Sequence, residues 1–172
     1  MDKMQFLKKK TVKEILNIIE KQWGLKKGFD DKLDFIFLMN SKNKIFIINK
    51  EIVNVDFDML RIDSMGLYLG EVKDLTSKNA ELRVSIEGSQ IIGPLATKNI
   101  VEISNGLKKL WIRGFDIEVK NTNGDDKTKN TDKINNAYVL VKNGNDFLGC
   151  GRLSNGKISN FVPKSRRVTS ED

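Results

Sequence analysis

The chain of 172 residues contains no histidine and only one cysteine, Cys150. Without histidine it cannot form a Ser-His-Asp triad, a Cys-His nucleophile pair or a histidine-ligated metal site. One cysteine cannot form an intramolecular disulfide or a multi-cysteine metal site. We therefore expect no catalytic residues of these classes and no bound metal.

Long apolar runs and nucleotide-binding motifs are also missing. The chain has no run of 18 apolar residues, and residues 1–10 lack the apolar core of a signal peptide. Gly149 and Gly151 precede no Gly-Lys-Ser/Thr sequence, and no Gly-x-Gly-x-x-Gly motif follows a predicted strand. We expect no cofactor, no membrane partner and a cytoplasmic location.

The acidic clusters do not indicate catalysis. Asp30, Asp31 and Asp34 lie in one predicted turn, and three further aspartates, Asp56, Asp58 and Asp63, lie in another. Short acidic side chains are common in turns because they bond to nearby backbone N–H groups. Cys150 lies among apolar residues of a predicted strand, where a thiol is inert without an activating base. We therefore expect a protein that is not an enzyme.

The charge is basic and unevenly distributed. Lys and Arg number 30 against 23 Asp and Glu, which gives a net charge of +7. Residues 147–168 contain five basic side chains and no acidic one. An excess of this kind favours an anionic partner such as nucleic acid, although lysine-rich surfaces are also common on proteins with no such partner.

The first half of the chain predicts a small α/β domain, residues 1–92. A capping box, Thr11 with Glu14, begins an amphipathic helix over residues 11–23, and Gly24 ends it. Further apolar runs predict a hairpin with strands at 33–39 and 45–48, and two later strands at 67–72 and 82–86. The predicted fold class is α+β, in which a β-rich domain follows this one.

The second domain is predicted to span residues 93–168. A short helix or turn at 90–96 precedes a strand at 100–103, a helix that Ser104 caps and Gly114 ends, and a strand at 115–119. Residues 121–136 are too polar to contribute to a core, so we predict a solvated loop insertion. The tail 169–172 is predicted to be disordered.

Two Asn-Gly pairs give the clearest pattern in the chain. Asn143-Gly144 and Asn155-Gly156 separate apolar segments at 137–142, 147–153 and 157–162, which predicts a three-stranded meander with type I′ turns. Gly149 and Gly151 lie inside the middle strand, where glycine indicates a bend or the close approach of another backbone. Trp23 and Trp111 lie on apolar helix faces and are predicted to anchor the two cores.

The predicted meander also indicates where the basic residues lie relative to one another. Arg152 and Lys157 lie near the same hairpin end, and Lys164, Arg166 and Arg167 follow Pro163, which ends the last strand. Basic side chains on a shallow sheet suit phosphate and sugar contacts better than base-specific pockets. A basic tail that is merely solvated is the alternative.

Several of these segments resemble a known family. The stretches Ala137–Arg152 and Asn160–Val168 look like the C-terminal half of an archaeal-type PUA domain, an RNA-binding pseudo-barrel. Together with Glu87–Ala96 and the helix that ends at Trp111-Ile-Arg-Gly114, they resemble the Nip-seven family of large-ribosomal-subunit biogenesis proteins. The resemblance implies a PUA domain that binds pre-ribosomal RNA through Arg152 and Lys157, with Lys164, Arg166 and Arg167 as weaker assignments.

The resemblance implies a non-catalytic assembly factor for pre-rRNA processing. Its RNA partner would be single-stranded or looped, and its N-terminal domain would contact ribosome-assembly or RNA-processing proteins. Two alternatives stay open: a subunit of an RNA-modification enzyme, because PUA domains often follow catalytic domains, and a protein adaptor that acts through its N-terminal domain.

Overall fold

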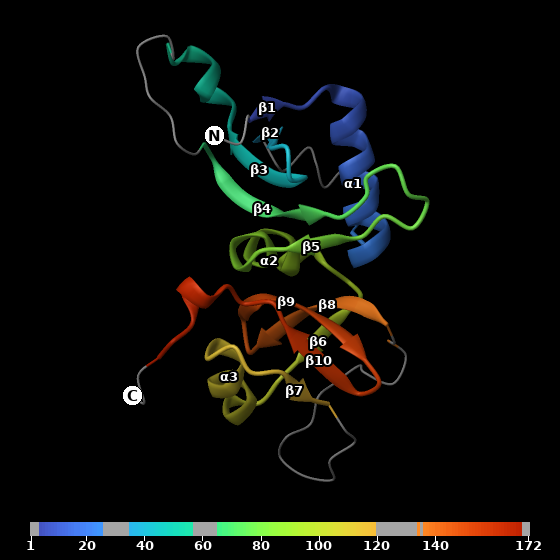
Figure 1. The fold of residues 1–172 in the computed structure, drawn as a ribbon, viewed down its shortest axis with the longest axis vertical. Coiled ribbons are helices and arrows are strands. Elements are labelled where there is room, and N and C mark those ends of the chain that lie inside the picture. Colours follow the sequence, from blue (N-terminus) through green and yellow to red (C-terminus); the bar gives the residue numbers. More distant parts are fainter. Residues whose placement is uncertain (1–3, 26–34, 57–64, 120–133, 135, 170–172) are drawn as a thin grey trace. The chain divides into compact units, whose positions relative to one another are not determined.

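The computed structural model describes residues 4–25, 35–56, 65–119, 134 and 136–169 (Figure 1). The chain divides into two compact units, residues 1–82 and 83–172. Apart from residues 134, 136 and 169, the predicted loop 121–136 and the predicted tail lie outside the described residues. None of the described helices is long and apolar enough to span a membrane.

Unit 1 is built on a five-stranded sheet in which neighbours along the chain are neighbours in the sheet. Strands β1 to β4 pair antiparallel, and the boundary between the two units falls inside β5, after Leu82. The hairpin of β2 and β3 confirms the one predicted. The elements are β1 (Gln5–Phe6), α1 (Lys9–Trp23), β2 (Phe35–Met39), β3 (Lys44–Asn49), the 3-10 helix η2 (Lys50–Asn54), β4 (Leu67–Val72) and β5 (Leu82–Val84).

Helix α1 begins two residues before the predicted start, and the predicted capping box is wrong. The N-cap is Lys8, which has an extended backbone and no side-chain cap. Strand β1 ends just before this residue. The Val12 N–H donates to the Lys8 carbonyl at 3.1 Å, so Thr11 lies inside the first turn of the helix. The helix ends as predicted at Gly24, whose φ is 67°.

One face of α1 contributes to the core of unit 1. Ile15, Ile19 and Trp23 follow each other at intervals of four residues and are buried, which confirms Trp23 as a core anchor. The Gln22 side-chain amide donates to the Leu82 carbonyl at 2.9 Å and accepts from the Leu82 N–H at 2.8 Å. The amide thus pairs with Leu82 as a neighbouring strand would, and ties the helix to the end of the sheet.

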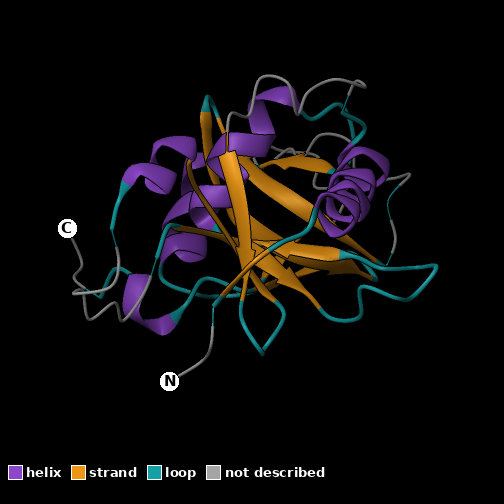
Figure 2. Cartoon of the chain, turned by 90° about the horizontal axis from the view of Figure 1, so that it is seen from above, coloured by secondary structure: helices purple, strands orange, loops and turns teal. Residues whose placement is uncertain are grey.

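Unit 2 contains a second five-stranded sheet, of order β6-β8-β9-β10-β7, which curls into a half-barrel (Figures 1 and 2). Only β6 and β8 pair parallel, and β8, β9 and β10 form the predicted meander. The elements are α2 (Ile86–Ile92), η3 (Gly93–Leu95), β6 (Ile100–Glu102), α3 (Asn105–Ile112), β7 (Ile117–Glu118), β8 (Ala137–Asn143), β9 (Asp146–Ser154), β10 (Lys157–Asn160) and η4 (Lys164–Arg166).

Helix α2 belongs to unit 2, whereas the predicted boundary at residue 92 placed it in the first domain. It also begins earlier than the predicted turn at 90–96, because the Ser85 hydroxyl accepts from the Gly88 N–H at 2.8 Å and caps it. The buried Ser89 hydroxyl then accepts from the Gly149 N–H of β9 at 3.0 Å. This long-range bond, which no local pattern reveals, joins α2 to the second sheet.

The two turns of the meander differ in type. Asn155 and Gly156 have φ values of 52° and 74°, as the predicted type I′ turn requires. In the first turn Asn143 stays in β8 and pairs with Asp146, so the turn residues are Gly144 and Asn145. Of these two, only Gly144 has a positive φ, which is the pattern of type II′, so the prediction of type I′ is wrong there.

Gly149 and Gly151 have the two roles that the sequence offered for them. Between the pairs Leu140–Cys150 and Lys142–Phe147, β9 has one residue more than β8, and Gly149 lies in this bulge with a φ of 109°. At Gly151 a Cβ atom would lie 2.7 Å from the Ser159 carbonyl oxygen and 2.8 Å from the Trp111 ring. Only glycine leaves room for the neighbouring strand and the ring.

The core of unit 2 surrounds Trp111. Its ring is fully buried, and its indole N–H donates to the Leu148 carbonyl at 2.9 Å. The prediction that it is a core anchor is confirmed, and Cys150 is buried as expected. The other members of the core cluster are Val101, Ile103, Ile117, Val119, Val139, Val141, Leu153, Ile158 and Val162.

Candidate nucleic-acid interface

The face of the unit 2 sheet opposite this core, here called the outer face, has two buried side chains, Leu140 and Cys150, and beside them a row of polar and aromatic ones. Tyr138 of β8 pairs with Arg152 of β9, which pairs in turn with Ser159 of β10. Successive side chains of a strand point to opposite faces, and the adjacent residues Val139 and Leu153 belong to the core cluster. The row from Tyr138 to Ser159 therefore lies on the outer face.

Two arginines and two aromatic rings form a continuous row on this face. The Arg152 guanidinium carbon lies 4.8 Å from the centroid of the Tyr138 ring, and the Arg83 guanidinium carbon lies 5.2 Å from that of Phe161. The two ring centroids are 5.9 Å apart at an interplanar angle of 58°. We call Arg83, Phe161, Tyr138 and Arg152 the cation–aromatic row; all four side chains are partly exposed.

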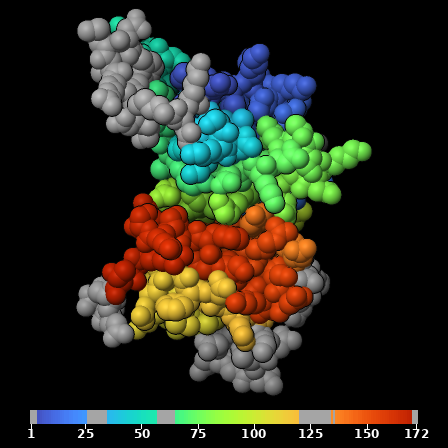
Figure 3. All heavy atoms as spheres, in the orientation of Figure 1, coloured from blue at the N-terminus to red at the C-terminus, as the bar shows by residue number. Residues whose placement is uncertain are grey.

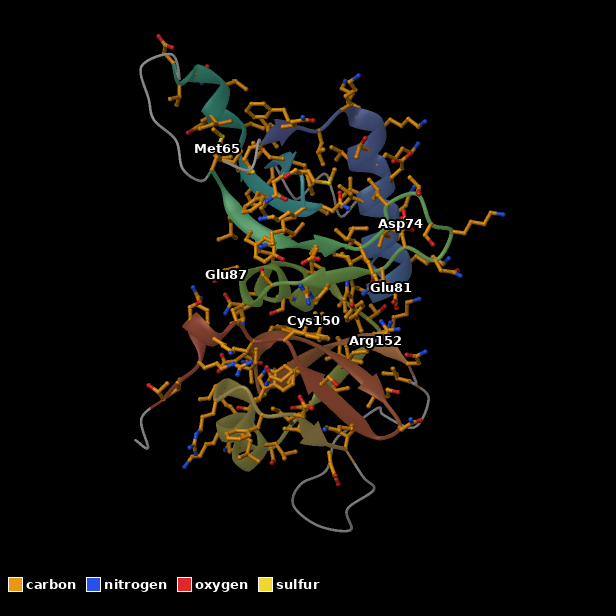
Figure 4. All side chains as sticks on the ribbon, viewed as in Figure 1. Met65, Asp74, Glu81, Glu87, Cys150 and Arg152 are labelled. Carbon is orange, nitrogen blue, oxygen red and sulfur yellow. The ribbon has the colours of Figure 1, made fainter. Side chains whose placement is uncertain are left out.

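Hydrogen bonds orient the guanidinium of Arg152, whose side chain is labelled in Figure 4. Its Nε donates to the Asn136 side-chain oxygen at 3.2 Å, and its Nη2 donates to the Asn136 carbonyl at 3.1 Å. The planar fork is thus held between an amide and an aromatic ring. A group oriented in this way loses less entropy when it binds a phosphate.

Lys157 lies on the same face as Arg152, at the hairpin end near which the sequence placed both residues. It is two residues from Ser159, the partner of Arg152, and is exposed at the start of β10. Its ammonium group forms an ion pair of 2.9 Å with Asp116. The Asn160 backbone N–H donates to the other Asp116 oxygen at 2.9 Å, and this bond and the one from Lys157 lower the pKa of the Asp116 carboxyl.

The other three predicted residues lie beyond the end of β10 and are not part of this row. Arg166 forms an ion pair with Glu87 of α2 at 2.6 Å. The Arg167 Nε donates to the Val162 carbonyl at 3.0 Å, and its side chain lies against Gly114, where a Cβ would collide with it. Lys164 is exposed, and its ammonium group has no polar partner within the described part of the chain.

Sequence reasoning missed Arg83, Tyr138 and Phe161. Strand alternation would have been the signal for Tyr138, but Val139, Leu140 and Val141 are all apolar and buried, so β8 does not show it. Arg83 and Phe161 carry no such signal, because their contact joins residues 78 positions apart. The row therefore depends on the tertiary fold.

The chemistry of this face is that of an anion-binding surface with π faces. Guanidinium and ammonium groups bind phosphate, while aromatic rings and guanidinium planes stack with bases. Over the described ranges, no three carboxylate or thiol side chains converge as a metal site would need.

Comparison with known families gives one match, which lies wholly in unit 2. Residues 98–168 match a family described as the PUA domain of the methyltransferase RsmF. No curated protein matches the chain. The matched stretch extends from just before β6 to the end of η4 and includes all five strands of the second sheet. The C-terminal part of this protein is therefore a PUA-type domain.

Proposed function

We propose that this protein is a non-catalytic RNA-binding factor that contacts RNA through its PUA-type domain. The match of residues 98–168 to a PUA family is the observation that carries the proposal. The outer face of the same domain supports it, because Arg152 lies there against the ring of Tyr138, which contacts Phe161, and Lys157 lies on the same face. The proposed partner is single-stranded or looped RNA, in which bases are free to stack.

The proposed biological role is assembly of the large ribosomal subunit and processing of its precursor RNA. The resemblance to the Nip-seven family over Glu87–Ala96 and the C-terminal segments supports it. Contacts with assembly or processing proteins are assigned to unit 1. Its described part exposes four large apolar side chains, Phe6, Val53, Val55 and Leu67, and such side chains are typical of protein interfaces when they lie together.

The direct test is a fluorescence-anisotropy titration with a short A/U-rich single-stranded RNA and a duplex DNA at several salt concentrations. If about four phosphates are neutralised, the logarithm of the affinity should fall with the logarithm of salt at a slope of about −3. The variant Arg152→Glu, Lys157→Glu should bind RNA at least tenfold more weakly and with a flatter slope. Affinity equal to the wild type would remove this face from the proposal.

A matched control comes from unit 1. Lys9 and Lys13 are exposed on α1, and Lys9→Glu, Lys13→Glu makes the same change of net charge. This variant should retain most of the RNA affinity, because its charges lie far along the chain from the PUA-type domain. Equal losses in the two double variants would mean that binding follows net charge alone.

The second candidate function is that of a subunit acting in RNA methylation. It rests on the description of the matched family, which names a methyltransferase. RNA incubated with the protein and S-adenosylmethionine and then digested for mass spectrometry would test it. A new methylated nucleoside would favour this function over the non-catalytic one.

A further inference from the structure

A second feature of unit 2 is an exposed apolar corner at the end of α3. Phe115 is 52% exposed, Leu110 42% and Val168 43%, and these are the large apolar side chains most exposed in the described part of this unit. Backbone bonds bring the three together: the Phe115 N–H donates to the Leu110 carbonyl and the Val168 N–H to the Ile112 carbonyl, both at 3.1 Å. Figure 3 shows the corresponding yellow and red segments side by side on one face.

The backbone that presents Phe115 is fixed. The prediction placed residues 115–119 in a strand, but β7 starts only at Ile117, so Phe115 lies in the connection between α3 and β7. The Asn160 side-chain amide donates to the Phe115 carbonyl at 3.0 Å, and the Asn160 N–H donates to Asp116. An exposed ring on a fixed backbone gives up the stabilisation of burial, and a binding role would explain its position.

One guanidinium group lies against the ring, and a second lies against the preceding residue. The Arg113 guanidinium carbon lies 5.6 Å from the Phe115 ring centroid. Arg167 packs on Gly114, the residue before Phe115, and its Nε is bonded to Val162, while its Nη groups have no polar partner among the described residues. The neighbouring carboxylate of Asp116 is already paired with Lys157. The carboxylate next to the ring in the sequence is therefore paired with a lysine of β10.

We propose that Phe115 is a stacking platform for one unpaired base of single-stranded RNA, and that Arg113 and Arg167 bind the adjacent phosphates. This inference rests on the proposed RNA-binding function and adds a base contact that the five predicted basic residues do not make. An exposed ring with guanidinium groups near it offers a stacking surface and phosphate ligands together. A nucleotide needs both, because its base is flat and its phosphate is anionic.

The test compares Phe115→Leu with Phe115→Trp in the full chain. Leucine keeps the apolar character and removes the flat π face, so affinity for single-stranded RNA should fall about tenfold. Tryptophan should keep the affinity, and its fluorescence should be quenched by RNA, whereas Trp23 and Trp111 are buried. Phe6→Leu is the control, since Phe6 is 54% exposed in unit 1, and it should leave binding unchanged.

Two sets of results overturn the inference. Unchanged affinity of Phe115→Leu, with no quenching in Phe115→Trp, would leave RNA binding intact and make the corner a protein contact. An equal loss for single-stranded RNA and for a duplex RNA would mean that the leucine variant acts through packing and not through base stacking. A wild-type protein that binds no RNA at any salt concentration would instead overturn the proposed function itself.

Discussion

The two units contain equal numbers of basic side chains and use them differently. Residues 1–82 have 15 basic and 13 acidic side chains, a net charge of +2, and residues 83–172 have 15 and 10, a net charge of +5. Five of the six arginines lie in unit 2. Four of these five contact a ring or a backbone carbonyl, namely Arg83, Arg113, Arg152 and Arg167. The number of cations does not distinguish the units; their type and fixed orientation do.

The units also differ in how they accommodate a buried tryptophan. The indole N–H of Trp111 donates to Leu148, whereas that of Trp23 has no partner among the described residues. Trp111→Phe should cost about 2 kcal/mol or more, because it leaves the Leu148 carbonyl unpaired in addition to the lost volume. Trp23→Phe should cost less, because it removes an unpaired buried donor.

Urea unfolding of the two tryptophan variants, followed by far-UV circular dichroism, measures this difference. Equal losses of unfolding free energy would mean that the two indoles have equivalent surroundings, and the contrast between the cores would disappear.

Arginine geometry can be tested without a change of charge. Arg152→Lys keeps the cation but loses the fork held by Asn136 and the stacking on Tyr138, so RNA affinity should fall about fivefold, or roughly 1 kcal/mol. Lys13→Arg in unit 1 should leave affinity unchanged. Anisotropy titration at one salt concentration compares the two, and an Arg152→Lys variant with wild-type affinity would show that charge alone matters at this position.

Internal carboxylates should compete with RNA phosphates for the basic side chains of unit 2. Glu87 holds Arg166, so Glu87→Gln should release the guanidinium and raise RNA affinity about two- to threefold. The control is Glu51→Gln, which removes an exposed carboxylate of unit 1. A loss of affinity in Glu87→Gln would instead show that the ion pair positions Arg166 for binding.

The smallest expected effect concerns pH. The pKa of Asp116 is lowered from 3.8, so its ion pair with Lys157 stabilises the fold above this pH and is lost as the pH falls through the lowered value. Asp116→Asn should therefore lower stability by less than about 1 kcal/mol at neutral pH, since an exposed pair is screened by solvent.

Thermal unfolding from pH 7 to pH 2 should show the wild type and Asp116→Asn converging in the acid range. Asp74 of unit 1 is a carboxylate for comparison with Asp116. Its pKa is also lowered, but by hydrogen bonds from the Thr76 side chain and backbone. A difference between wild type and Asp116→Asn that persists at pH 2 would mean that the carboxylate charge is not its source.

Much of the secondary structure could be predicted because the signals were local. The turn at Asn155-Gly156, the Ser104 cap and the Gly24 stop each depend on the conformation of one or two residues, and all three are confirmed. The capping box at Thr11 failed because a preceding strand set the helix start. The first Asn-Gly turn was placed one residue too early, because strand pairing extended β8 to Asn143.

In the candidate site, too, some positions could be predicted from local sequence and others could not. The sequence placed Arg152 and Lys157 near the same hairpin end, and the strand register puts them on one face. The positions of Arg166 and Arg167 depend on Glu87 and Gly114, which are 79 and 53 residues away in the chain. No local pattern could indicate that these two arginines are held by contacts within the protein.

The sequence by itself determined most of the helices and strands and the basic character of the C-terminal segment, because these follow from local composition and turn chemistry. The similarity of that segment to PUA domains came from comparison with a known family. Tertiary structure decided which cations meet which partners. The cation–aromatic row and the ion pair of Arg166 with Glu87 both join distant parts of the chain. The exposure of Phe115 likewise depends on how the whole unit packs. The physical reason is that a contact between distant residues arises from packing and strand register, and no short stretch of sequence determines either of them.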